Sequence, residues 1–258
     1  LLTSCARQAH IYDMAGSVNA QVVAVGEPAK ELEVSEQLIY AMDWIGIPSG
    51  YFTMEVLEIS YIRNHRVYHM VSKAVPNKFF KFFHDVEYVM HSYVDTESFR
   101  PIKYEKKRIS KSGSTVEKID FYYEEGKVIW EHTDPIAKEE MKIPEQSPQD
   151  LMSAVYYFRL KDIVLGAVYP MNIIYRGQFW PMDVSIEKLA YVEALNRAKE
   201  KAFVVSPKSK LNRRITGFNS IEIYFSLDRA RLPLFFKMRT KIGYLKGVLI
   251  NHPAEAPR

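Results

Sequence analysis

The sequence predicts a mainly β protein, a strongly curved antiparallel sheet or open β-barrel with one or two short helices. Three observations predict it. Apolar and polar residues alternate along many short segments, turn-forming residues separate these segments, and aromatic residues, which favour strands, make up 13% of the chain. Many short strands with few helices are typical of barrels and curved sheets.

The first predicted strands form a hairpin. Alternate residues of the segment 38–44 share one face of a strand, and its apolar run ends at residues 45–47. Residues 48–50, Pro-Ser-Gly, are a turn signal, and the alternation resumes at residues 52–56. A third run follows over residues 67–74.

The middle of the chain continues in the same pattern. The apolar, aromatic residues 78–83 suit a short helix. Turn signals at residues 98–101, 112–113 and 125–126 divide the following segments. The strands predicted here lie at residues 86–93, 102–109, 117–123 and 128–131.

The clearest helical signal starts at Ser147. Ser147 can cap the helix, and Pro148 suits the first helical position, where its missing N–H costs nothing. Asp150 then lies in the first turn, where the helix dipole favours a negative charge. Apolar residues repeat at helical spacing through Arg159.

The last third of the chain is predicted as strands. Residues 189–202 have a helix-like spacing, but the neighbouring segments all alternate with period two. The predicted strands lie at residues 171–175, 182–186, 221–227 and 234–250.

Four motifs in this order resemble those of a bacterial exported family known as domain of unknown function 3108. They are YAMDWIGIPSG at residues 40–50, VDTESFRP at residues 94–101, PQDLMSAVYYFR at residues 148–159 and SLDRARLP at residues 226–233. The similarity covers roughly residues 36–250.

The resemblance implies an exported envelope protein with a strongly curved antiparallel sheet. Its outline is similar to that of the envelope carriers and receptors of lipoproteins, whose concave face can hold acyl chains. The family has no established activity to carry over to residues. It also implies a strand pair with a Gly turn near residues 190–205, but residues 195–198, Leu-Asn-Arg-Ala, lack Gly. We therefore expect two strands joined by a polar turn.

The N-terminus carries a signal of its own. Leu2-Thr3-Ser4-Cys5 looks like a bacterial lipobox, and Cys5 is the only cysteine in the sequence. We expect residues 1–5 to be the remnant of a lipoprotein signal with Cys5 acylated, although an ordinary thiol on a frayed terminus is the alternative. No Asp follows Cys5, which resembles the default sorting to the periplasmic face of the outer membrane.

The remaining domain organisation follows from composition. Residues 6–34 read as a flexible tether, residues 35–252 as a single β domain and residues 253–258 as a C-terminal tail. No apolar run approaches the ~20 residues that cross a bilayer, and one cysteine excludes a disulfide framework. The charge of +4 and the basic residues within 103–111 and 208–214 come without a nucleic-acid-binding motif. We read them as a solvated strand face and a polar loop, with contact to anionic lipid headgroups as the alternative, and expect no nucleic acid partner.

No residues with a catalytic, metal-binding or cofactor-binding pattern emerge, and we do not expect an enzyme. His65 and His69, His84 with Asp85, and residues 131–134 have ligand side chains without a zinc spacing. The sequence has neither a nucleophile elbow nor a phosphate-binding Gly-rich loop. Asp95, Glu97 and Asp228 are explained by turn capping and local ion pairing.

Aromatic stripes are the remaining candidates for a binding site. They alternate along strands and should face one side, either as a filled core or as the wall of a ligand cavity, and periodicity does not separate these readings. The residues are Trp44, Phe52, Phe121, Tyr123, Trp130, Phe225 and Phe236.

Three functions follow as hypotheses. The first is a non-enzymatic cell-envelope lipoprotein, held on the membrane by its acylated N-terminus, whose β body binds a lipid or other apolar envelope molecule. The second is a structural or assembly subunit that has a filled core and docks an envelope protein partner. The third is a hydrolase with a site built from scattered residues.

Overall fold

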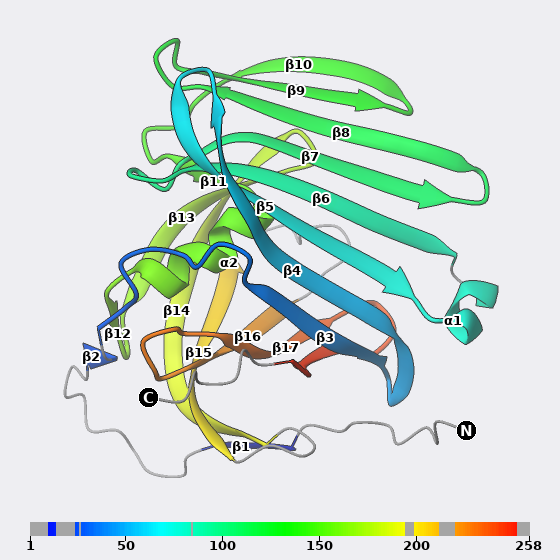
Figure 1. Cartoon of the computed structure of the whole chain (residues 1–258), viewed down its shortest axis with the longest axis vertical. Coiled ribbons are helices and arrows are strands. Elements are labelled where there is room, and N and C mark those ends of the chain that lie inside the picture. The colour runs from blue at the N-terminus through cyan, green and yellow to red at the C-terminus, as the bar shows by residue number, and fades with distance from the viewer. Residues whose placement is uncertain are drawn as a thin grey trace.

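One large sheet contains most of the residues of the protein (Figure 1). The computed structural model describes residues 10–13, 24–25, 27–83, 85–193, 199–211 and 220–251. Sixteen strands belong to the large sheet, and two short strands form a second sheet. The two helices of the described residues have six and ten residues. The predicted fold class is confirmed.

The first half of the large sheet is an antiparallel meander, in which each strand pairs with the next along the chain. Short turns join the strands, and several of them contain residues with positive φ, such as Asn64 and Gly126. The strands are β3 (Gln37–Trp44), β4 (Ile47–Ile62), β5 (His65–Pro76), β6 (Val86–Asp95), β7 (Pro101–Ser110), β8 (Gly113–Tyr122), β9 (Lys127–Thr133) and β10 (Ile136–Lys142).

The second half is a similar meander that returns to the first. Its last strand, β18, pairs with β3 and joins the two halves into one sheet. The strands are β13 (Val168–Tyr175), β14 (Gln178–Glu193), β15 (Glu200–Ser209), β16 (Ser220–Ser226), β17 (Pro233–Arg239) and β18 (Tyr244–Leu249). Four short strands complete the fold: β1 (His10–Asp13) beside β14, β11 (Pro148–Gln149) parallel to β13, and β2 (Ala24–Val25) paired with β12 (Ile163–Val164).

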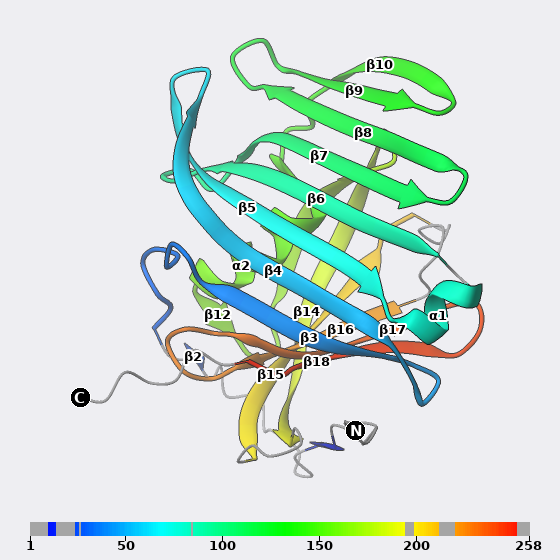
Figure 2. The same cartoon turned by 45° about the vertical axis from the view of Figure 1, so that its right-hand side comes forward.

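The sheet curves strongly without closing. Its path runs from β10 at one edge to β11 at the other, and in the described strands no hydrogen-bonded ladder joins these edges. Figures 1 and 2 show that the sheet bends around helix α2 (Leu151–Leu160), while the short helix α1 (Lys78–Phe83) follows β5 at the outer end of the strands. The structure is therefore an open barrel-like sheet with a helix on its concave side.

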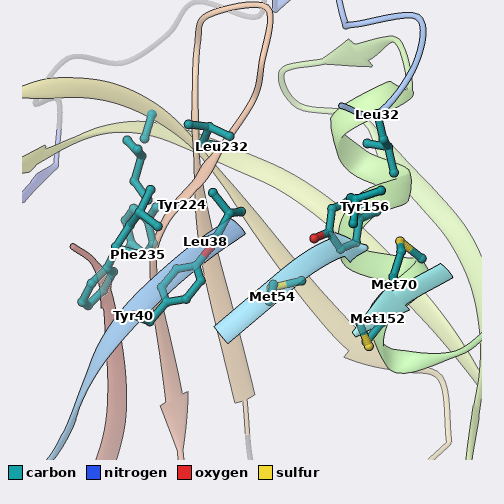
Figure 3. Close-up of a cluster of buried hydrophobic side chains, with 14 of the residues drawn as sticks. Leu32, Leu38, Tyr40, Met54, Met70, Met152, Tyr156, Tyr224, Leu232 and Phe235 are labelled. Atoms are coloured by element: carbon teal, nitrogen blue, oxygen red, sulfur yellow. The ribbon is translucent and has the colours of Figure 1, made fainter. Parts of the chain in front are cut away.

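The main core lies between α2 and the strands around it. Met152 and Tyr156 of α2 are buried, and Figure 3 shows them close to Met70 of β5. Burying large apolar side chains on the concave face is the main favourable contribution to folding of such a sheet. The buried residues labelled in Figure 3 are Leu32, Leu38, Tyr40, Met54, Met70, Met152, Tyr156, Tyr224, Leu232 and Phe235.

Polar contacts fix α2 inside the sheet. The guanidinium of Arg159 donates two hydrogen bonds to the carboxylate of Glu36, at 2.5 and 2.7 Å, and the side chains of both residues are only 5% exposed. Arg159 Nε also donates to the carbonyl oxygen of Ala230 at 3.1 Å. One side chain thus joins the helix to the segment before β3 and to the loop between β16 and β17.

The N-terminus of α2 is capped by a buried carboxylate. The Asp150 carboxylate accepts hydrogen bonds from the backbone N–H groups of Met152 and Ser153, and the Ser153 hydroxyl accepts one from the Asp150 backbone N–H, which completes a capping box. Ser92 of β6 donates a further hydrogen bond to Asp150 at 2.5 Å. Burial raises the pKa of Asp150 above its ordinary value, although these hydrogen bonds oppose the shift.

We expect the substitution Asp150→Ala to lower the free energy of unfolding by about 2–3 kcal/mol, because the helix loses its cap and buried donors lose their acceptor. Asp150→Asn keeps an acceptor and should cost far less. Because the pKa of Asp150 is raised in the folded state, the wild type gains stability relative to Asp150→Asn at pH values below the ordinary carboxyl pKa. This gain is lost as the pH rises through the raised pKa. Urea unfolding of the three proteins over a pH series measures both effects, and a pH-independent difference between wild type and Asp150→Asn would contradict them.

Several predicted boundaries are wrong for identifiable reasons. Residues 48–50 lie inside β4, because the turn is made by Ile45 and Gly46 at positive φ and a bulge shifts the register beside Asp43. The second helix begins at Leu151 rather than after Ser147, because Pro148 and Gln149 pair with β13 and Asp150 is the cap. Residues 189–193 and 200–202 are in strands despite their helix-like spacing, since pairing with neighbouring strands decides their structure.

Parts of the segment predicted as a tether are paired or buried in the described residues. Residues 10–13 pair with β14, residues 24–25 pair with β12, and Leu32 is buried in the main core. The end of β14 that extends beyond its pairing with β13, and the apolar core, provide binding partners for this segment. The polar turn predicted at residues 195–198, Cys5 and residues 253–258 all lie outside the described residues.

Candidate functional site

Side chains from the two ends of the open sheet pack together where the described strands share no hydrogen-bonded ladder. The turn between β13 and β14 lies against the concave face of β7–β9, where buried residues of both parts form one apolar cluster. Tyr104, Ile119 and Phe121 come from one side, and Ile174 with the partly buried Phe179 from the other. We call this contact the seam, and define it by Tyr88, Tyr104, Lys106, Glu117, Trp130, Tyr175 and Gly177.

A lysine points into the seam. Lys106 Nζ lies 5.3 Å from the ring centre of Tyr88 and 5.5 Å from that of Tyr175. An ammonium group over an aromatic face is attracted by the ring quadrupole. Burial nevertheless lowers the pKa of Lys106 below its ordinary value, although the nearby Glu117 carboxylate opposes this shift. The seam therefore holds a partly desolvated cation.

Opposite the lysine, Trp130 packs on a glycine. Its indole N–H donates to Glu117 Oε1 at 2.9 Å, which fixes the ring. A Cβ atom built on Gly177 would come within 2.7 Å of the Trp130 ring, and Gly177 has a φ of +63°. Both the left-handed backbone and the close approach require glycine here. Trp130 thus contacts the β13–β14 turn directly.

The seam also contains a buried hydroxyl group without a hydrogen-bond partner among the described residues, Tyr104 Oη. Tyr104 precedes Lys106 by two positions on β7, so both side chains face the concave side. A buried hydroxyl without a partner costs about 1–3 kcal/mol. A ligand with a polar end would contact an apolar wall and find a hydrogen-bond donor and a cation beside it.

The substitution Lys106→Met is expected to stabilise the protein at neutral pH, because it removes a desolvated charge from an apolar contact. The lowered pKa means that the native state binds fewer protons than the unfolded state between that pKa and about 10.5. The stability of the wild type should therefore rise with pH through this window relative to Lys106→Met. Urea unfolding at several pH values measures this difference, and equal pH dependence of the two proteins would contradict the assignment.

The seven aromatic residues predicted from alternation do not form one site. Phe121, Tyr123 and Trp130 belong to the seam cluster, and the rings of Phe121 and Tyr123 stack at 6.0 Å. Phe52 and Phe236 pack against the main core, while Phe225 stacks on Phe203 in a second cluster. Trp44 lies at the end of β3, edge-on to Phe80 of α1. The curvature of the sheet distributes residues of one face over separate clusters.

Sequence reasoning missed Lys106. The basic residues within 103–111 were expected to form a solvated strand face, but only alternate residues of β7 face solvent. Because Tyr104 is buried, the pleat also turns Lys106 inward. The position of Lys106 two residues after Tyr104 on the same strand face is the sequence signal that could have identified it.

Asp95 and Asp228, two of the motif carboxylates, cap turns as predicted. Asp95 accepts hydrogen bonds from the backbone and hydroxyl of Ser98, both at 2.8 Å. Asp228 accepts from the Ser226 hydroxyl at 2.7 Å and from the Arg231 N–H at 3.0 Å. Together with Asp150 and Arg159, these residues give three of the four motifs structural roles in turns and in holding α2.

The described candidate histidines contact aromatic rings, each other or a single carboxylate, and do not form a metal site. His69 Nε2 lies 3.0 Å from His91 Nδ1, and His69 stacks on Tyr93 at 4.4 Å. His65 contacts Asp95 at 3.3 Å. Among the described residues no three His, Cys, Asp or Glu side chains are grouped to hold a metal ion, and His84 is not among these residues.

Comparison with known proteins gives a family and a solved structure to which the chain is similar. The model of the family described as "Protein of unknown function (DUF3108)" matches residues 39–250. No curated protein matches the sequence significantly. A solved structure of a β-barrel-like protein of domain of unknown function DUF1849 from Brucella abortus aligns with 83% of this chain and 95% of its own, at a TM-score of 0.49 and 10% identity. Neither helix in the described part of the chain has the length and apolar character needed to cross a membrane.

Proposed function

The chain belongs to the DUF3108 family of proteins of unknown function, and we propose that it is a non-enzymatic lipoprotein of the bacterial cell envelope. In this proposal the open sheet binds a lipid or another apolar envelope molecule at the seam. The apolar part of the ligand contacts Trp130 and the neighbouring aromatic side chains. An acidic or hydroxyl group at its end contacts Lys106 and the hydroxyl of Tyr104.

One observation supports this proposal: the two ends of the sheet share no ladder among the described strands but pack through side chains, which include a partly desolvated lysine and a buried hydroxyl. A hydrogen-bonded ladder must break at every residue to open, whereas a side-chain contact opens by rotamer changes and a shift of one turn. Perturbed ionisable groups among apolar residues favour a ligand site over a purely structural contact.

A filled interior favours the second candidate function, a structural or assembly subunit that docks an envelope protein. The region around α2 is occupied by the chain's own side chains, with Met152 and Tyr156 reaching the opposite strands. A second filled cluster lies between β13, β14 and the end of α2. Ligand binding is therefore proposed at the seam and not at the concave face as a whole.

The membrane anchor belongs to the same proposal. Acylation of Cys5 would hold the protein at the periplasmic face of the outer membrane, because two or three acyl chains bind a bilayer more firmly than one. Metabolic labelling of cells with a palmitate analogue tests it. Label on the native protein that is lost in Cys5→Ser supports the anchor, and an unlabelled native protein contradicts it.

Native mass spectrometry of the protein purified from its own envelope separates the two candidate functions. The proposal predicts an adduct of small-molecule mass that organic extraction removes, and that is depleted in Lys106→Met. A stoichiometric protein partner without a small-molecule adduct would favour the assembly subunit. The protein mass alone, without either addition, would contradict both.

A further inference from the structure

One end of the sheet carries an exposed apolar surface. In helix α1, Phe79, Phe82 and Phe83 are 60%, 84% and 70% exposed. The turns β3–β4 and β17–β18 add exposed isoleucines. We call this surface the rim, and define it by Ile45, Ile47, Phe79, Phe82, Phe83 and Ile242. In Figures 1 and 2, α1 lies at the end of the strands opposite the β4–β5 turn.

The rim residues form one surface and not scattered side chains. The rings of Phe79 and Phe82 pack against Phe83 at 5.4 and 5.3 Å. Trp44 connects α1 to the β17–β18 turn, because its ring is 5.6 Å from Phe80 and its indole N–H donates to the carbonyl of Ile242 at 2.9 Å.

The β3–β4 turn also belongs to this surface. A Cβ built on Gly243 would come within 2.1 Å of Ile45, so the β3–β4 and β17–β18 turns lie against each other. Contiguous exposed apolar surfaces of this kind mark interaction sites on soluble domains.

The charges at the rim are mainly positive. Lys78 begins α1, and Arg239 and Lys241 lie at the β17–β18 turn; all three are exposed and, within the described residues, have no ion pair. The acidic groups closest to α1 are neutralised, since Glu87 pairs with Lys81 at 2.5 Å and Asp85 with Lys111 at 3.8 Å. The rim therefore combines exposed aromatic rings with three exposed cations that have no ion pair within the described residues.

We propose that the rim is a bilayer-contacting surface that inserts its phenylalanine rings among the acyl chains of an anionic membrane. Aromatic side chains favour the membrane interface, and cations beside them are attracted by anionic headgroups. A protein partner would require complementary acidic and apolar groups in a fixed geometry, whereas a bilayer accepts a convex, ring-covered tip of this kind. This contact is independent of the seam ligand and of acylation at Cys5.

Vesicle binding by the full chain carrying Cys5→Ser tests the rim without an acyl anchor. The probes are vesicles of phosphatidylcholine with phosphatidylglycerol and vesicles of phosphatidylcholine alone. We expect Phe82→Ser with Phe83→Ser to weaken binding to anionic vesicles by at least about tenfold, because two rings lose their burial. Lys78→Glu with Lys241→Glu should remove the preference for anionic vesicles and its salt dependence.

The control is Tyr61→Ser, since Tyr61 is 70% exposed like Phe83 but lies at the other end of β4. It should bind as the parent does. Phe82 and Phe83 are largely exposed, and their ring contacts among the described residues are with exposed rings of α1, so their variants should keep the circular dichroism spectrum and the seam adduct of the parent. Equal binding by the phenylalanine variant, or no binding by the parent to either vesicle, would overturn the proposal. A dimer in solution that the phenylalanine variant abolishes would assign the rim to a second copy and overturn it as well.

Discussion

Replacing Arg159 by Leu is expected to lower the free energy of unfolding by about 3–5 kcal/mol, because it leaves the Glu36 carboxylate buried without its counter-ion. The ion pair is nearly inaccessible to water, and the same guanidinium also satisfies the carbonyl of Ala230. The loss should be seen as a lower urea midpoint at unchanged slope.

The double variant Glu36→Leu with Arg159→Leu should recover most of this loss, because no uncompensated charge remains. Lys208→Ala is the matched control, since Lys208 pairs with Glu187 at the same 2.5 Å in an exposed position. It should cost less than about 1 kcal/mol. Similar losses for Arg159→Leu and Lys208→Ala would show that the buried pair does not fix α2 in the sheet.

Replacing Gly177 by Ala is expected to destabilise the protein and to loosen the seam. The new methyl group enters the space of the Trp130 ring, and overpacking of this kind costs about 1–3 kcal/mol. The strain of a left-handed alanine adds about 1–2 kcal/mol. Trp130 must then move, and we expect its emission maximum and its quenching by a soluble quencher to change in the native state.

Gly126→Ala separates the two contributions. Gly126 has a φ of +66°, close to the +63° of Gly177, but a Cβ there meets no atom within 4 Å. It should show the backbone strain alone. In a Trp130→Leu background the cost of Gly177→Ala should fall towards that of Gly126→Ala, which a double-mutant cycle measures. Equal costs for the two glycine variants in the wild-type background would place Trp130 away from the turn.

Much of the fold follows from the local pattern. Alternation predicts the strands because one face of each is buried, and the segment 78–83 forms a helix where the sequence predicts one. The motifs predict turn caps at Asp95 and Asp228 because the carboxylates lie beside suitable donors. Strand β10 was missed because its residues are mostly exposed and charged, which leaves no apolar face to detect.

The seam depends on information that the local pattern lacks. It brings together residues of β6–β9 and the β13–β14 turn, and their contact depends on the accumulated curvature of the whole sheet. Alternation placed Trp130 and Phe121 on one face but also grouped them with Phe52 and Phe225, which lie in other clusters. Alternation also places Trp44 on this face, but Trp44 is the last residue of β3 and contacts Phe80 and Ile242 at the rim.

Photoaffinity mapping with a diazirine-labelled fatty acid tests ligand binding at the seam. The full chain in detergent solution is irradiated with the probe, digested and sequenced by mass spectrometry. We expect saturable labelling of peptides from β7–β9 and the β13–β14 turn. Unlabelled fatty acid and the substitution Lys106→Met should each reduce this labelling. Labelling confined to the peptides of the rim, or labelling that does not saturate, would contradict it.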